Sequence, residues 1–149
     1  MTQSLRESLL EKNTKEIGKL LIAIVKLEPK LSELPFFNLT SFNTQLSNNY
    51  GNLSWYLIFE KEYKEAINSA EKGLNIDKEQ TWIYTNLALS NLLAGNKEVA
   101  MRIYDKFKNQ STSNKKSFKE VFKSDLKEVK EVKLLNLALY DEILEKLNQ

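Results

Sequence analysis

One stretch of the sequence recurs 34 residues later, and the two copies align without a gap. Residues 50–74 read YGNLSWYLIFEKEYKEAINSAEKGL, and residues 84–108 read YTNLALSNLLAGNKEVAMRIYDKFK. The pairs that agree in type at the informative positions are Tyr50 with Tyr84, Asn52 with Asn86, Leu53 with Leu87, and Ala66 with Ala100. A period of this length is typical of a helix–turn–helix unit whose apolar faces are buried by stacked neighbours. The repeat therefore predicts a stack of helical hairpins.

The rest of the chain also has the pattern of helices. Glycine (four) and proline (two) are scarce, and no stretch shows the sustained apolar and polar alternation of a half-buried strand. We therefore predict an all-α fold. The helices are expected at residues 47–60, 63–75, 80–93, 97–109, 116–131 and 134–147, after N-terminal helices with a break at residues 12–14.

Two connections differ from the short turns that join these helices. The segment between Pro29 and Tyr50 carries few charges, and its Phe36, Phe37 and Phe42 are expected to pack a loop or short helix against the core. Residues 109–117 (NQSTSNKKS) are predicted to form a mobile loop that ends in a helix cap at Ser117.

Composition narrows the classes of partner. The 149 residues suit one domain, and Lys plus Arg exceed Asp plus Glu only by 22 to 20, too little for a strong phosphate-binding footprint. The longest aliphatic run, Leu20 to Val25, is far shorter than the ~20 residues that cross a bilayer. The start, MTQSLRESLLEKNTKE, lacks the plan of a secretion signal, and the chain has no Cys. We expect a cytoplasmic protein that binds neither nucleic acid nor membrane.

Catalysis is not indicated by the sequence. The chain has no His, the side chain most often used as a general base and as a transition-metal ligand. A glycine-rich phosphate loop is also missing, and the acidic pairs Glu60/Glu62 and Asp141/Glu142 are expected on exposed helices or turns. We predict no enzyme activity, catalytic residue, cofactor or metal.

The repeated residues resemble the tetratricopeptide repeat family. In the first copy, the residues that match this family's pattern are Tyr50, Leu53, Ser54, Ala66 and Gly73. The second has Tyr84, Leu87, Ala88, Gly95, Ala100 and Tyr104. The small residues are expected to let the two helices of a hairpin approach closely, Ser54 against Ala66 and Ala88 against Ala100. Departures from the pattern are Lys78 where Pro is usual, and Phe107 and Phe122 where a small residue is usual.

This resemblance implies a right-handed stack of antiparallel helical hairpins that forms one domain over residues 1–149. Within it we expect a degenerate helical pair and the aromatic-rich connection at 1–46, two repeats within 47–110 and capping helices at 111–149. The repeat units themselves are placed at about 47–80 and 81–114. The phase continues to Phe118 and Val121, 34 residues after Tyr84 and Leu87, which marks the third, less regular unit.

The resemblance also implies where a partner binds. In this family the first helix of each pair lines an inner concave face, and an Asn at the place of Asn52 and Asn86 hydrogen-bonds the backbone of an extended peptide. The alternative is an exposed polar residue in an Asn-rich chain. Trp55, which follows Asn52 by one turn, and Trp82 are candidate anchors for a partner, or else core residues. Phe59 would extend an apolar groove beside Trp55.

Lysines on the third inner helix are a further candidate. Lys119 and Lys123, with Lys116, are placed to meet a partner's carboxylate, as in some peptide-binding relatives. Glu120 stands where the key basic residue of that arrangement would be, and a solvated helix face is the alternative.

We interpret the chain as a non-catalytic module, a monomer or weak homo-oligomer, that binds a protein or peptide partner in its concave groove. The alternative is an assembly module, or an accessory domain of a larger complex, that uses an exposed apolar stripe on the last helix at Leu144 and Leu147. Similar repeat segments also occur as parts of larger bacterial proteins.

Overall fold

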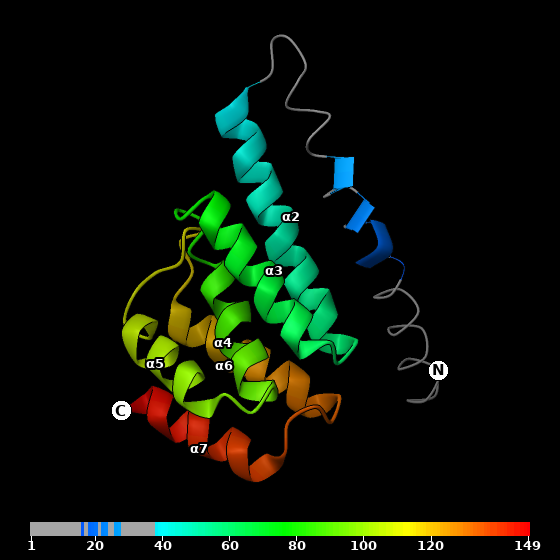
Figure 1. The fold of residues 1–149 in the computed structure, drawn as a ribbon. Coiled ribbons are helices and arrows are strands. Elements are labelled where there is room, and N and C mark those ends of the chain that lie inside the picture. Colours follow the sequence, from blue (N-terminus) through cyan, green and yellow to red (C-terminus); the bar gives the residue numbers. More distant parts are fainter. Residues whose placement is uncertain (1–15, 17, 21, 24–25, 28–37) are drawn as a thin grey trace, which may run out of the picture.

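The computed structural model describes residues 38–149, together with residues 16, 18–20, 22–23 and 26–27, which are helical (Figure 1). Over residues 38–149 the helices are α2 (Leu39–Phe59), α3 (Tyr63–Ile76), α4 (Ile83–Leu93), α5 (Lys97–Phe107), α6 (Phe118–Glu131) and α7 (Leu137–Asn148). The described part of the chain contains no β-strand, only an isolated bridge between Ser111 and Ser117. The predicted all-α class is confirmed.

The first helix of the repeated region is longer than predicted. Helix α2 begins at Leu39 and not at residue 47, because the Asn38 side chain caps it by accepting a hydrogen bond from Ser41 N at 3.0 Å. Phe42 therefore lies in the first turn of this helix and not in a connecting loop. Phe36, Phe37, Pro29 and the predicted break at 12–14 lie outside the described residues. The other helices lie within a few residues of their predicted positions.

Helices α2, α4 and α6 end in the same way. After each, two backbone N–H groups reach back to carbonyls of the last turn: Lys61 to Ile58 and Glu62 to Leu57, Gly95 to Leu92 and Asn96 to Asn91, Lys133 to Lys130 and Leu134 to Val129. The residue that turns the chain has a positive φ in all three, at Lys61 (62°), Gly95 (88°) and Lys133 (62°). This pairing is the Schellman motif, which ends a helix and reverses the chain. The first helix of each of these hairpins thus ends in the same C-terminal capping motif.

The helices pack as consecutive hairpins. Helix α2 packs on α3, α4 on α5 and α6 on α7, while the first helices also contact one another in order, α2 with α4 and α4 with α6. Small residues bring α2 and α3 together: Ser54 Oγ donates to Ala66 O at 2.7 Å, and Ser47 Oγ donates to Gly73 O at 2.7 Å. The predicted close approach of Ser54 and Ala66 is confirmed, and both residues are fully buried.

Aromatic side chains fill the junction of α4, α5 and α6. Their rings touch in sequence, with centroid distances of 4.4 Å for Tyr84 and Phe107, 4.9 Å for Phe107 and Phe118, and 5.4 Å for Phe118 and Phe122. Phe107 and Phe122 are the two residues that stand where the tetratricopeptide pattern has a small residue. Large rings replace small side chains at this junction, so the third hairpin packs on the second through an aromatic cluster.

The last helix turns its apolar side inward. Ile143 and Leu147 are fully buried against the main core, and Leu144 is half-buried. Polar contacts add to this packing: Lys97 pairs with Glu142 at 2.6 Å and Lys123 Nζ donates to Asn148 Oδ1 at 2.6 Å. The expectation of an exposed apolar stripe on this helix is therefore wrong, because the stripe covers the end of the chain's own core.

Candidate functional site

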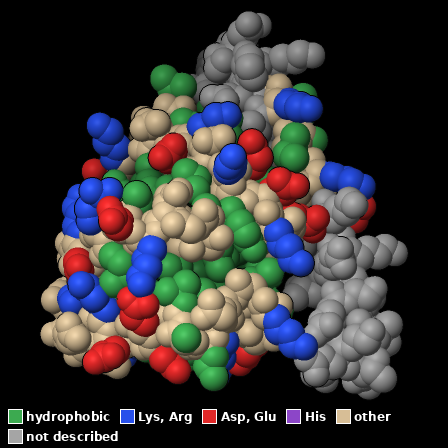
Figure 2. Space-filling view, turned by 60° about the horizontal axis from the view of Figure 1, so that its bottom comes forward, with side chains coloured by type: hydrophobic (Ala, Val, Ile, Leu, Met, Phe, Trp, Pro, Cys, Tyr) green, Lys and Arg blue, Asp and Glu red, His purple; other side chains and the backbone are tan. Residues whose placement is uncertain are grey.

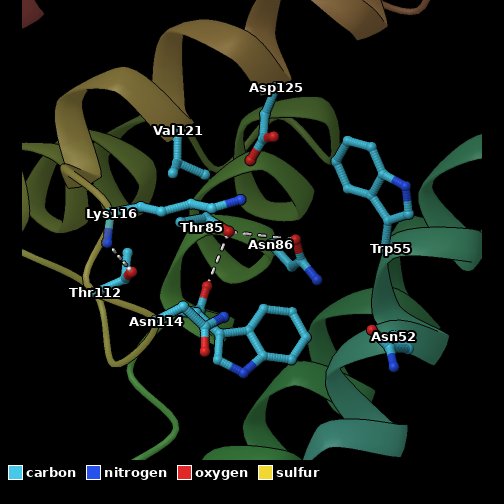
Figure 3. Close-up of a pocket in the computed structure, with 10 residues that line it drawn as sticks. Asn52, Trp55, Thr85, Asn86, Thr112, Asn114, Lys116, Val121 and Asp125 are labelled. Atoms are coloured by element: carbon cyan, nitrogen blue, oxygen red, sulfur yellow. Dashed lines mark hydrogen bonds between the residues drawn. The ribbon is translucent and has the colours of Figure 1, made fainter.

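A pocket of about 210 Å³ lies among α2, α4, α6 and the loop before α6 (Figure 3). Helix α2 contributes Asn52 and Trp55, and the start of α4 contributes Trp82, Thr85 and Asn86. The loop and α6 complete the wall with Thr112, Asn114, Lys116, Val121 and Asp125. Four residues that the sequence singled out, Asn52, Trp55, Trp82 and Asn86, thus come together at one site.

The two asparagines have different environments. Asn52 is exposed on the rim, where its amide faces solvent. Asn86 is buried, and its Nδ2 donates to Gly51 O on α2 at 2.8 Å. The Asn86 amide nitrogen therefore joins α2 to α4 in place of binding a peptide backbone as predicted, whereas the Asn52 amide is exposed and available to a partner.

The tryptophans form two sides of the pocket and are half-buried. The Trp82 ring is fixed by a hydrogen bond from its Nε1 to Asn48 Oδ1 at 2.9 Å, across α2 and α4. Trp55 packs edge-on against Phe59, with ring centroids 5.0 Å apart, and both rings rest on the main core. Each tryptophan thus combines a packing role with a face on the pocket, and Phe59 supports Trp55 from behind.

The loop before α6 contains a hydrogen-bonded turn that is also bonded to the start of α4. Thr112 N donates to Lys116 O and Lys115 N donates to Thr112 O, both at 2.8 Å, which closes a tight turn. Ser113 N donates to Thr81 Oγ1 at 2.9 Å, which ties the turn to the start of α4. The predicted cap at Ser117 is confirmed, since its side chain accepts from Glu120 N. The loop therefore forms a defined wall.

Lys119 and Lys123 lie away from this pocket. Lys119 lines a separate, open depression beside Lys108 and Ser111, and Lys123 is bound to Asn148 on α7. At about 100° of rotation per residue, Val121 and Asp125 flank the buried stripe of α6 on one side, and the two lysines flank it on the other. The structure does not bring these lysines together with the tryptophans.

Asp125 is a charged site residue that the sequence did not indicate, as it did not indicate Thr85, Thr112 and Asn114. Burial, then the nearby charge of Glu128, raises the pKa of its carboxyl group to about 7, against a partial lowering by the Thr85 hydroxyl. In the sequence this residue stands in SDLKEVKEV, a pattern of exposed helical charges. Only its packing beside α4 distinguishes it from the surface carboxylates around it.

Comparison of the chain with protein families, with characterised proteins and with solved structures gave no match. Among the helices that the structure describes, none combines the length and the apolar character needed to cross a bilayer.

Proposed function

We propose that this chain is a non-catalytic protein–protein interaction module with the architecture of tetratricopeptide repeats, which binds a segment of a partner protein. The observation that carries the proposal is the pocket between the first helices of three consecutive hairpins. In a helical-repeat stack these helices line the concave face, which is the usual binding surface. The 34-residue repeat and the shared ending of α2, α4 and α6 support the same architecture.

The chemistry of the pocket suits a peptide. Tryptophan faces supply contact area with little loss of side-chain entropy, and the exposed amides of Asn52 and Asn114 can both donate to and accept from a peptide backbone. On the face shown in Figure 2, lysine and arginine side chains alternate with acidic ones around a hydrophobic centre. This mixture of signs favours a protein partner over nucleic acid, which needs a continuous basic surface.

The alternative of assembly through the last helix has less support, since Ile143 and Leu147 are buried within the chain. We therefore do not place the partner surface on α7.

Peptides selected from a random display library on the immobilised protein would test the proposal. Their affinities, measured by isothermal titration calorimetry, should fall by about two- to tenfold for Asn52→Ala and for Asn114→Ala, the usual loss for one hydrogen bond. Asn68→Ala is the matched control, because Asn68 is an exposed asparagine on α3 outside the pocket. Failure to select any peptide, or equal affinities for all three variants, would contradict the proposal.

A further inference from the structure

Asp125 places a carboxylate in the pocket wall, where the group that lowers its pKa is the neutral Thr85 hydroxyl and not a lysine or arginine. Figure 3 shows its side chain pointing toward the space between Lys116 and Trp55. Within residues 38–149 it forms no ion pair with any lysine or arginine; the ion pairs there involve other residues. A half-buried carboxylate that is not paired lowers the stability of the fold, so a binding role would account for its position better than a structural one.

The tryptophans give the same pocket a second feature that attracts positive charge. The face of an indole ring is the strongest aromatic site for a cation, and guanidinium groups stack on it readily. Trp82 is held in orientation by Asn48, and Trp55 by its packing on Phe59. Two positioned indoles and a carboxylate therefore line one cavity of about 210 Å³. That volume equals several water molecules at ~30 Å³ each, enough for a cationic head group.

We propose that this pocket receives the side chain of a lysine or arginine from the partner, with Asp125 as counter-charge and the indoles of Trp55 and Trp82 as walls. This inference rests on the proposed function and adds the chemistry of the residue that is recognised. Charge complementarity with Asp125 excludes an acidic anchor, and the half-buried carboxylate disfavours a purely apolar one.

Lys116 acts as a competitor in this arrangement. Its exposed side chain lines the same pocket as Thr85 and Asp125, and it forms no ion pair with Asp125. A positive charge at this place repels an incoming cation. Removal of the Lys116 charge should therefore strengthen binding, and removal of the Asp125 charge should weaken it.

The probe for the test is N-acetyl-L-arginine amide, and its matched control is N-acetyl-L-citrulline amide, which has a neutral urea in place of the guanidinium. Trp55 and Trp82 are the two tryptophans of the chain, so their two indole N–H signals in a nitrogen-15 NMR spectrum report directly on the pocket. The arginine compound should shift both signals to saturation. The citrulline compound should produce at least tenfold weaker binding.

Three variants make the test specific. Asp125→Asn should weaken binding of the arginine compound at least tenfold, Lys116→Met should strengthen it about two- to fivefold, and Glu131→Gln, at the exposed end of α6, should leave it unchanged. Circular dichroism checks that each variant is folded. If Asp125→Asn does not fold, the Lys116→Met result and the citrulline control still decide the question.

Binding should also weaken about tenfold between pH 8 and pH 6, since only the ionised Asp125 attracts a cation and its pKa is about 7. The charged and titratable groups around it are Glu128 on α6, Tyr104 on α5 and Lys116 in the loop. Equal binding of the two amides, or an unchanged affinity in Asp125→Asn, would overturn the inference.

The two proposals fail in different ways. Library peptides that bind in the pocket but lack lysine and arginine would overturn the cation site and leave the interaction function intact. An arginine compound that binds the pocket, while no peptide is selected, would support the cation site and contradict the interaction function.

Discussion

Gly51 is a residue of α2 that the start of α4 approaches closely. A Cβ atom at this position would lie 2.6 Å from Trp82 Cη2 and 2.8 Å from Ile83 Cγ1. The carbonyl of the same residue accepts the hydrogen bond from Asn86. The close approach of Trp82 and the hydrogen bond from Asn86 thus meet at one backbone position of α2.

Gly51→Ala is expected to destabilise the protein. Alanine gains about 0.8–1 kcal/mol of helix propensity over glycine, but overpacking a close contact costs about 1–3 kcal/mol, so the loss exceeds the gain. Urea unfolding should show a lower midpoint, and the tryptophan emission should shift to the red as Trp82 moves outward. Gly18→Ala is the control, because nothing lies within 4 Å of its added Cβ. Equal stability changes in both variants would contradict this account of Gly51.

Single residues also show how far the sequence could predict the site. Asn52, Trp55, Trp82 and Asn86 come together because the 34-residue repeat fixes their register on consecutive first helices. The environment of Asn86 could not be predicted, because it depends on the carbonyl of a helix 35 residues away. Whether Asp125 and Lys119 face the pocket depends on how α6 is rotated about its axis. That rotation is set by the buried stripe of Phe118, Phe122, Leu126 and Val129.

At the scale of elements, the residues that end α2 and α6 adopt a backbone conformation that lowers the stability of the fold. Lys61 and Lys133 occupy the left-handed conformation that Gly95 adopts at the equivalent place after α4. In this conformation a residue with a Cβ atom lowers the free energy of unfolding by about 1 kcal/mol or more, whereas glycine does not. The predicted helix limits place breaks at all three positions, but only glycine indicates the left-handed conformation in a sequence, so the conformations of Lys61 and Lys133 could not be predicted.

Exchanging the residue types at two of these helix endings tests the effect of the left-handed conformation on stability. Lys61→Gly should raise the free energy of unfolding by up to about 1 kcal/mol, and Gly95→Lys should lower it by a similar amount. Chemical denaturation of both variants measures the difference. Changes of the same sign in the two variants would show that their positive φ angles are not the cause.

Most elements were predictable because apolar periodicity and turn residues agree from residue 50 onward. The start of α2 was not, because residues 38–49 are rich in Asn, Ser and Thr, which are typical of loops as well as of helix caps. Their helical state is supported by the cap at Asn38 and by packing of Leu46 and Ser47, which are buried. Tertiary contacts thus override a local sequence that favours a loop.

For the molecule as a whole, the pocket carboxylate links stability to pH. The pKa of Asp125 is about 7 in the folded protein, above the ~3.9 of an unfolded chain. The folded state therefore binds the proton more tightly, and the free energy of unfolding should fall as pH rises from about 4 to about 7. Glu128, whose pKa is raised by burial and by Glu131, acts in the same direction.

Asp125→Asn should remove most of this dependence. At pH 8 the variant should be more stable than the parent chain by about 1–3 kcal/mol, because an uncharged amide replaces a poorly hydrated carboxylate, and at pH 4 the two should be similar. Urea unfolding at both pH values measures this. A variant that is less stable at pH 8 would show that the carboxylate supports the fold. The same substitution weakens cation binding in our proposal, so stability and recognition would oppose each other at one residue.

Helix α2 extends well beyond its contact with α4 at Gly51. It is 21 residues long, whereas α3 has 14, and in Figure 1 its first turns project past the other labelled helices. At 1.5 Å per residue the tip at Leu39 stands roughly 18 Å from Gly51. Within this span α2 is joined to the second half of α3 and the residue after it, since Ser47 Oγ donates to Gly73 O at 2.7 Å and Thr44 Oγ1 donates to Asp77 Oδ2 at 2.8 Å. Any rotation of α2 about Gly51 would break these two bonds, so the two helices of the first hairpin are expected to move as one rigid unit.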